Sequence, residues 1–129
     1  MMDIDYFKEC NDQYGHLSGD KCLVVVANVL KEVFSEKKAV VCRFGGDEFI
    51  ILTQNLSRQE LEDCLKKIGS HPALKKVRGV GVTLTISIGA VNCIPQKEDV
   101  ETQFLYAADK LLYEVKQNGR NGYRYEERL

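Results

Sequence analysis

The sequence predicts an α+β fold built on an antiparallel sheet. Three observations support this: β-favouring runs at the start of the chain and on both sides of residue 45, strict apolar–polar alternation over 82–90, and three stretches with apolar residues at helical spacing. In chain order the elements are β-α-β-β-α-β, followed by an added C-terminal helix and a short strand or tail. This order is the ferredoxin-like split βαβ pattern, in which the sheet is antiparallel at its centre.

The N-terminal part is expected to hold a strand, a connector and a helix. Residues 1–7 have strand character and begin abruptly, so we expect the chain to be a fragment of a longer protein. Residues 8–20 are polar and contain two glycines, which predicts a connector with room for one helical turn. From Ser18 or Asp20 onward the apolar residues fall at i, i+3, i+4 and i+7, which predicts a helix ending near Phe34.

A hairpin, a second helix and a further strand are expected next. Apolar runs at 40–42 and 50–52 flank a turn that contains two glycines, which is typical of a β-hairpin. Ser57 begins a capping box that opens a second helix. Residues 69–81 are predicted to be a loop, and residues 82–90 alternate as in a strand with one buried face.

The C-terminal part is expected to be a third helix followed by a short strand or tail. Apolar residues from Phe104 to Val115 share one helical face, and Asn118-Gly119 end the helix. Crossover rules place the first strand between the second hairpin strand and the strand at 82–90, antiparallel to both. Distant parts of the sequence are therefore expected to meet at one edge of the sheet.

Composition limits the function classes. The chain has 129 residues, enough for one domain with a real core, and its net charge of −1 gives no overall basic field for nucleic acid. The longest apolar run, residues 23–27, is far too short to span a bilayer, and no signal peptide is visible. Five scattered cysteines without a CxxC spacing favour reduced thiols over a zinc site. We expect a cytoplasmic domain without nucleic-acid partners or direct membrane contact.

Three acidic residues form the first candidate site. The predicted topology brings Asp3, at the end of the first strand, beside Asp47 and Glu48 in the hairpin turn. Carboxylates without histidine or thiolate partners select hard cations, Mg²⁺ or Mn²⁺, and such ions act in phosphoryl or nucleotidyl transfer. The alternative is a solvated acidic turn, with Asp3 and Asp5 only ending a strand.

Two further pairs of residues suit a nucleotide. Lys116 and Arg120 lie four residues apart at the end of the third helix, where they could bind phosphate or simply offset the helix dipole. Asn11 and Asp20 match the donors and acceptors on the Watson–Crick edge of guanine. Taken alone, Asn11 also suits a turn and Asp20 also suits a helix start.

Several motifs resemble those of the GGDEF domain, the diguanylate cyclase family. They occur in the family's order through nearly the whole chain, which is far more specific than one five-residue string. The motifs are Asp3-Ile4-Asp5-Tyr6-Phe7-Lys8, Asn11-Asp12, Tyr14-Gly15-His16, Gly19-Asp20, Arg43-Phe44-Gly45-Gly46-Asp47-Glu48-Phe49, Ser87-Ile88-Gly89, Ala108-Asp109-Lys110, Leu112-Tyr113 and Lys116 with Gly119-Arg120-Asn121.

The resemblance implies an activity, a fold and a metal. Members of this family condense two GTP molecules into cyclic di-GMP and release two pyrophosphates, on a sheet related to polymerase palms and nucleotide cyclases. The resemblance implies Mg²⁺ or Mn²⁺ as cofactor and a transient homodimer, because each 3′-hydroxyl must attack the α-phosphate of the other GTP. It also implies bacterial second-messenger signalling, with an upstream sensory or receiver domain in the full-length protein.

The resemblance also assigns roles to individual residues. The implied metal ligands are Asp3, the backbone carbonyl of Ile4, Asp47 and Glu48. The implied catalytic residues are Asp47 and Glu48, one of which would help to deprotonate the attacking hydroxyl. The implied guanine-binding residues are Asn11 and Asp20, with His16 nearby on the nucleotide. The implied phosphate-binding groups are Lys116, Arg120 and backbone amides near Tyr6 and Phe7.

Two features depart from the family pattern. The Arg-x-x-Asp product-binding motif that often precedes the hairpin is replaced by Glu36-Lys37-Lys38-Ala39, so we expect no product-inhibition site. The helix that normally precedes the first strand, with its Leu-Thr-Gly-Leu-like motif, is absent from the sequence. We expect residues 1–129 to form a GGDEF domain without that helix, within a larger signalling protein.

Two other functions stay open on the sequence alone. A catalytically silent module would bind GTP at the same residues and regulate a partner domain without turnover. An interaction domain would use the acidic hairpin only as a turn. Incubation with GTP and Mg²⁺ separates the three: product indicates the enzyme, bound but unchanged GTP indicates the module, and no binding indicates neither.

Overall fold

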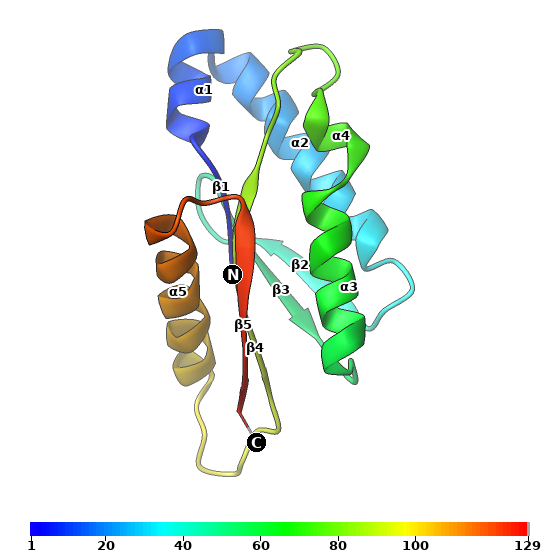
Figure 1. The fold of residues 1–129 in the computed structure, drawn as a ribbon, viewed down its shortest axis with the longest axis vertical. Coiled ribbons are helices and arrows are strands. Elements are labelled where there is room, and N and C mark those ends of the chain that lie inside the picture. Colours follow the sequence, from blue (N-terminus) through cyan, green and yellow to red (C-terminus); the bar gives the residue numbers. More distant parts are fainter. Residues whose placement is uncertain (129) are drawn as a thin grey trace.

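A five-stranded sheet forms the centre of the molecule (Figure 1). The computed structural model describes residues 1–128. Its strands are β1 (Met2–Ile4), β2 (Ala39–Arg43), β3 (Glu48–Thr53), β4 (Ile86–Cys93) and β5 (Gly122–Arg128). Its helices are α1 (Phe7–Tyr14), α2 (His16–Val33), α3 (Arg58–Gly69), α4 (Pro72–Lys75) and α5 (Glu101–Gln117).

β1 is the central strand in the order β2-β3-β1-β4-β5. It pairs antiparallel with β3 and with β4, as the crossover rules predict, while β5 joins the outer side of β4 in parallel. The register sets Asp3 opposite Glu48 on one side and opposite Ser87 on the other. The predicted α+β fold with an antiparallel centre is therefore confirmed.

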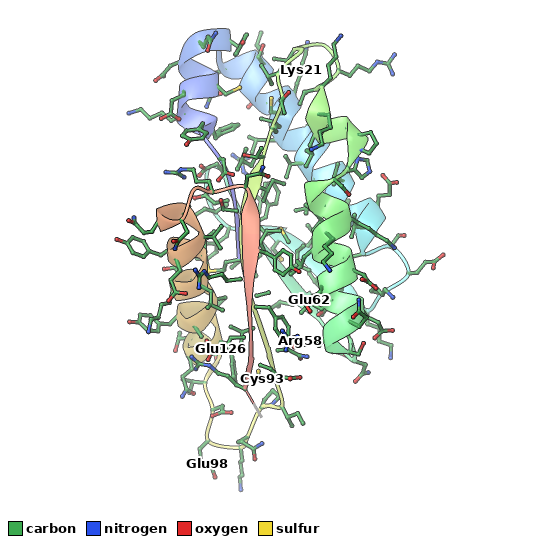
Figure 2. The ribbon with its side chains drawn as sticks, in the orientation of Figure 1. Lys21, Arg58, Glu62, Cys93, Glu98 and Glu126 are labelled. Atoms are coloured by element: carbon green, nitrogen blue, oxygen red, sulfur yellow. The ribbon has the colours of Figure 1, made fainter. Side chains whose placement is uncertain are left out.

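Helices pack on the sheet, with α5 on one side and α2 and α3 on the other (Figure 1). Gly89 lets α5 approach β4 closely, because a Cβ at that position would lie 2.1 Å from the carbonyl oxygen of Ala108. Arg58 and Glu62 on α3 face β5 (Figure 2), where the Arg58 guanidinium lies 5.0 Å from the ring centre of Tyr125. These contacts hold the long strands β4 and β5 between helices.

The segment after β1 is more helical than the sequence predicts. The predicted strand at 1–7 ends early, because Tyr6 adopts a φ of 56° and α1 begins at the next residue. The predicted connector at 8–20 forms most of α1 and the first turn of α2, which meet at Gly15 with a φ of 87°. Since α1 buries only Phe7, it lacks the apolar stripe by which an amphipathic helix is recognised.

The region before β4 also differs from the prediction. The expected loop at 69–81 contains the short helix α4, and the expected strand at 82–90 is shifted towards the C-terminus. Leu84 donates its N–H to the carbonyl of Leu74 at 2.7 Å. The first residues of the alternating stretch therefore bond to α4 instead of joining the sheet, and this explains why alternation overestimated the strand on that side.

The hairpin, the capping box and the third helix agree with the predictions. In the capping box, the Ser57 hydroxyl accepts the N–H of Glu60 at 3.1 Å, and the Glu60 carboxylate accepts the N–H of Ser57 at 2.8 Å. Within residues 1–128, no helix has the length and apolar character needed to cross a membrane. The elements that matter for the site are β1, the β2–β3 hairpin, the α1–α2 pair and the end of α5.

Candidate functional site

Three carboxylates meet where the end of β1 lies beside the tip of the β2–β3 hairpin. Asp3 is opposite Glu48 in the antiparallel register, and Asp47 comes immediately before β3. One oxygen of each carboxylate lies within 4.8 Å of an oxygen of the other two. The N–H of Ile4 donates to the carbonyl of Asp47 at 3.1 Å, which fixes the hairpin tip against β1. The structure thus brings together acids that lie more than forty positions apart in the sequence.

Burial and the two neighbouring acids change the acidity of Asp47. Burial, followed by the hydrogen bond and charge of Asp3 and the charge of Glu48, raises the pKa of Asp47 to about 6. Asp3 is only 7% exposed, and among the described residues its Oδ1 atom has no hydrogen-bond partner. A buried oxygen without a partner is costly, and a cation would satisfy it. This all-oxygen donor set fits Mg²⁺ or Mn²⁺.

Lys116 lies against the same acids. It is in the last turn of α5, and its Nζ donates to the Oδ2 atom of Asp3. The ion pair is partly buried, with 28% of the Lys116 side chain exposed and 9% of the Asp3 side chain. Lys116 therefore neutralises one of the three negative charges, while the second oxygen of Asp3 has no hydrogen-bond partner in residues 1–128.

Asp5 holds the loop that carries Arg120. The carboxylate of Asp5 is buried and accepts the hydroxyl of Ser87 at 2.6 Å, the hydroxyl of Thr85 at 2.7 Å and the N–H of Asn121 at 3.0 Å. A guanidinium nitrogen of Arg120 lies 4.0 Å from the same carboxylate. Since these partners are 80 or more positions away, Asp5 fastens β1, the start of β4 and the loop after α5 together.

The Arg120 guanidinium lies over the ring of Tyr6, 4.9 Å from its centre. Both residues have positive φ angles, 64° for Arg120 and 56° for Tyr6, so both backbones are held in the left-handed region. Such strained conformations persist only where the surrounding structure fixes them. The contact places Arg120 beside the N-terminus of α1, where Phe7 begins the helix and backbone N–H groups are available to an anion.

Arg43 shapes the hairpin tip. Its guanidinium donates to the carbonyl of Gly45 at 3.1 Å and to the carbonyl of Gly46 at 2.8 Å. The N–H of Phe44 closes the turn by donating to the carbonyl of Glu48 at 2.9 Å. These bonds fix the shape of the turn, and Asp47 and Glu48, which come directly after it, lie next to β1.

The α1–α2 pair holds a second group of candidate residues. Asn11 lies in α1 and packs on Gly19 of α2, where a Cβ would be 1.7 Å from the Asn11 Oδ1 atom. That Oδ1 atom is buried and has no hydrogen-bond partner within residues 1–128. Asp20 follows Gly19 and is exposed, and His16 is exposed at the first position of α2. The Asn11 oxygen and the Asp20 carboxylate both accept hydrogen bonds, so they suit a ligand that carries N–H or O–H donors.

The candidate residues thus fall into two groups on different elements. The first group lies where β1 ends and β3 begins, at the end of the sheet that we call the sheet edge. It contains Asp3, Asp47, Glu48, Lys116 and Arg120, with Tyr6 stacked on Arg120. The second group lies on the α1–α2 pair and contains Asn11, His16 and Asp20. Sequence reasoning missed the part played by Asp5, which follows directly after the short buried strand β1.

Solved structures of known function share this fold. The GGDEF domain of PA1120 (TpbB or YfiN) from Pseudomonas aeruginosa superimposes with a TM-score of 0.82 at 30% identity, over 96% of this chain and 73% of that one. The active GGEEF domain of a diguanylate cyclase from Vibrio cholerae superimposes with a TM-score of 0.81 at 26% identity, over 99% of this chain and 81% of that one. The fold is that of a cyclase-type GGDEF domain.

The sequence comparisons agree with the structural ones. The family described as "Diguanylate cyclase, GGDEF domain" matches residues 1–122, and the chain belongs to this family. Diguanylate cyclase A of Treponema denticola is 37% identical over 123 residues, which are 94% of this chain and 33% of that protein. Diguanylate cyclase DgcP of Pseudomonas aeruginosa is 35% identical over 125 residues, 94% of this chain and 18% of that protein. The chain therefore spans about a third or less of these relatives.

Proposed function

We propose that this chain is a diguanylate cyclase domain that condenses two GTP molecules into cyclic di-GMP and two pyrophosphates. The observation that carries the proposal is the convergence of Asp3, Asp47 and Glu48 within 4.8 Å, next to two cationic side chains at the same sheet edge. Acids that gather a divalent cation beside groups that bind phosphate are what transfer between nucleotides requires. Membership of the GGDEF family supports the same reaction.

The residues present fit a divalent cation. Asp3, Asp47 and Glu48 would hold Mg²⁺ or Mn²⁺, together with the backbone carbonyl of Ile4. The cation would also satisfy the Oδ1 atom of Asp3, which has no hydrogen-bond partner in the described part of the chain. When bound, the ion supplies charge neutralisation at the α-phosphate and lowers the pKa of a coordinated hydroxyl. Burial, followed by the neighbouring acids Asp3 and Glu48, raises the pKa of Asp47 to about 6, and a cation would favour its charged form.

The chain's own residues bind and orient the nucleotide. Lys116 and Arg120 would hold the terminal phosphates, helped by the backbone amides at the start of α1 near Tyr6 and Phe7. Lys116 would exchange its contact with Asp3 for a phosphate oxygen. Asp47 or Glu48 would accept the proton of the attacking 3′-hydroxyl, a task for which a pKa near the working pH is favourable.

Base recognition is assigned to the α1–α2 pair. The unpaired Oδ1 atom of Asn11 would accept from guanine, and the exposed Asp20 carboxylate would accept from two neighbouring N–H groups of the base. His16 would lie near the nucleotide from the first turn of α2. A site built to accept hydrogen bonds rejects bases that lack the matching donors, which gives the preference for guanine.

The reaction requires two copies of the chain, because each 3′-hydroxyl attacks the other GTP molecule. We therefore propose a transient homodimer in which each copy contributes one GTP. An upstream sensory or receiver domain in the full-length cytoplasmic protein would control that encounter. Bringing the two nucleotides into line supplies much of the rate by removing the entropic cost of a bimolecular step.

The test is incubation of the purified chain with GTP and Mg²⁺, followed by chromatographic detection of cyclic di-GMP. Asp47→Asn is expected to abolish product formation while the circular dichroism spectrum stays unchanged, and retained activity would remove Asp47 from the mechanism. Bound but unconverted GTP would support a silent regulatory module instead. The Lys116–Asp3 ion pair favours that second candidate, because the pair must break before both groups can serve the nucleotide.

A further inference from the structure

Arg120 presents a guanidinium group whose hydrogen-bond donors are not used inside the molecule. Its ion-pair partner within residues 1–128 is Asp5, and the 4.0 Å between guanidinium nitrogen and carboxylate is too long for a hydrogen bond. That carboxylate already accepts three donors, the hydroxyls of Thr85 and Ser87 and the N–H of Asn121. In the part of the chain that the structure describes, the Arg120 side chain therefore keeps its N–H donors for a ligand, and 34% of it is exposed.

The ring of Tyr6 orients this guanidinium. The central carbon of the Arg120 guanidinium lies over the ring, 4.9 Å from its centre, which is within the range of a cation–π contact. Such a contact uses the face of the ring and needs no N–H group to donate to an acceptor. Tyr6 is 59% exposed, so its side chain does not fill the core. The ring therefore holds Arg120 in place and leaves its donors available.

A second cation–π pair in the chain differs in one respect. The Arg58 guanidinium lies 5.0 Å from the ring centre of Tyr125, and its Nε atom also donates to Glu62 at 3.2 Å. Arg58 and Glu62 lie one turn apart on α3 and are both labelled in Figure 2. Arg58 thus has an acidic partner inside the molecule, whereas Arg120 has none at hydrogen-bond distance in the described part of the chain. The Tyr6–Arg120 pair is therefore open to an external anion.

The backbone fixes both members of this pair. Tyr6 has a φ of 56° and Arg120 a φ of 64°, in the left-handed region that residues other than glycine rarely adopt. The residues next to them are joined by a hydrogen bond of 3.0 Å, in which the N–H of Asn121 donates to the carboxylate of Asp5. In Figure 1 the loop from α5 to β5, which carries Arg120, passes beside the junction of β1 and α1. The fold itself therefore brings the ring and the guanidinium together, beside the N-terminus of α1.

We propose that Tyr6 is a positioning residue whose ring holds Arg120 for the last phosphate of the nucleotide, and that it thereby favours a triphosphate over a diphosphate. The effect on the nucleotide rests on the proposed function, whereas the contact between ring and guanidinium does not. An arginine that is ordered in advance loses less side-chain entropy when a phosphate binds. Only a ligand whose phosphate reaches Arg120 gains from this, so a diphosphate, which lacks the last phosphate, does not.

Substitutions at position 6 separate the ring from the backbone conformation. Tyr6→Leu removes the ring and keeps an apolar side chain, whereas Tyr6→Asn removes the ring and suits the left-handed backbone. Tyr6→Phe keeps the ring and removes only the hydroxyl, so it should behave as the wild type does. The matched control is Tyr106→Leu, which removes another exposed tyrosine from the first half of α5. Urea denaturation of each variant checks that the fold persists.

The first experiment tests the contact by NMR in protein without nucleotide. Protons that lie over an aromatic ring resonate upfield, so the Hδ and Hε signals of the Arg120 side chain report on the ring of Tyr6. We expect upfield positions in the wild type and in Tyr6→Phe, and a return towards ordinary arginine values in Tyr6→Leu and Tyr6→Asn. Identical Arg120 signals in the wild type and in the two variants without the ring overturn the proposal.

The second experiment measures the affinities for a non-hydrolysable GTP analogue and for GDP by calorimetry in the presence of Mg²⁺. We expect Tyr6→Leu and Tyr6→Asn to bind the analogue about fivefold more weakly, because one more side chain must be ordered on binding. Their affinity for GDP should stay unchanged. Tyr6→Phe and Tyr106→Leu should keep the wild-type ratio of the two affinities. Equal losses for both nucleotides, or no loss for either, overturn the proposal.

A double variant tests whether Tyr6 acts through Arg120. In an Arg120→Ala background, Tyr6→Leu should cause no further loss of affinity for the analogue, because the ring has no guanidinium left to hold. A further fivefold loss in that background overturns the positioning role. A wild-type chain that binds neither nucleotide overturns the proposed function together with the effect on the nucleotide, whereas the Arg120 NMR signals decide separately whether the ring holds the guanidinium.

Discussion

The sheet edge and the α1–α2 pair carry the two halves of the proposed nucleotide site, and they are built in different ways. At the sheet edge, strand register and a buried carboxylate, Asp5, fix the acids and Arg120 through bonds that span 80 to 116 positions. In the α1–α2 pair, the Asn11 side chain packs on Gly19, and its Oδ1 atom has no hydrogen-bond partner among the described residues. The comparison suggests that the first half cannot change without loss of stability, whereas the second can lose binding while the fold persists.

The largest effect is expected from Asp5→Ala. It leaves the hydroxyls of Ser87 and Thr85 and the N–H of Asn121 without their shared acceptor. We expect the free energy of unfolding, measured by urea denaturation, to fall by about 3 kcal/mol. The matched control is Asp12→Ala, which removes an exposed carboxylate from α1 and should change stability by about 0.5 kcal/mol or less. Similar losses in both variants would remove the distinction between the two regions.

Gly19→Ala tests the opposite half. Its Cβ would collide with the end of the Asn11 side chain, which can rotate away. We expect affinity for a GTP analogue to fall about tenfold, while the free energy of unfolding changes by about 1 kcal/mol or less, because the higher helix propensity of alanine offsets the crowding. Gly69→Ala in α3 meets nothing within 4 Å and should leave affinity unchanged. If Gly19→Ala lowers the free energy of unfolding as much as Asp5→Ala does, this half is as rigid as the sheet edge.

The smallest effect is expected from Asp47 in the absence of metal, and it depends on pH. The pKa of Asp47 is raised from 3.8 to about 6 in the folded chain, so the folded chain binds the proton more tightly than the unfolded chain does. Stability from this group is therefore complete below pH 4 and is lost as the pH rises through 6. In chelator, Asp47→Asn should lack this decline when unfolding is followed from pH 4 to pH 7. An identical pH dependence in both proteins would contradict the raised pKa of Asp47.

Much of the sheet edge could be predicted from sequence because it follows from topology. Once β1 is placed between β3 and β4, the period of two along each strand brings Asp3 beside the hairpin acids. The role of Asp5 could not be predicted, because an acid at a strand end carries no local sign of which distant donors will reach it. Its partners Ser87 and Asn121 are set only by the tertiary fold.

The α1–α2 pair was harder to predict for a different reason. α1 is a short polar helix that buries only Phe7, so its sequence resembles a connector. The glycine at position 19 looked like a loop residue, whereas it serves close packing inside α2. Asn11 and Asp20 were identified as a pair through their hydrogen-bonding chemistry, and the contact between Asn11 and Gly19 became visible only in the structure.

The central claim is that Asp3, Asp47 and Glu48 hold a divalent cation where the triphosphate of GTP binds. The most direct measurement is paramagnetic broadening of backbone amide NMR signals during titration with Mn²⁺ and a non-hydrolysable GTP analogue. We predict selective broadening at residues 3–5 and 47–48, which Asp3→Asn should greatly weaken. Broadening that is spread over the exposed acids of the surface, and that is unchanged in Asp3→Asn, would contradict the account.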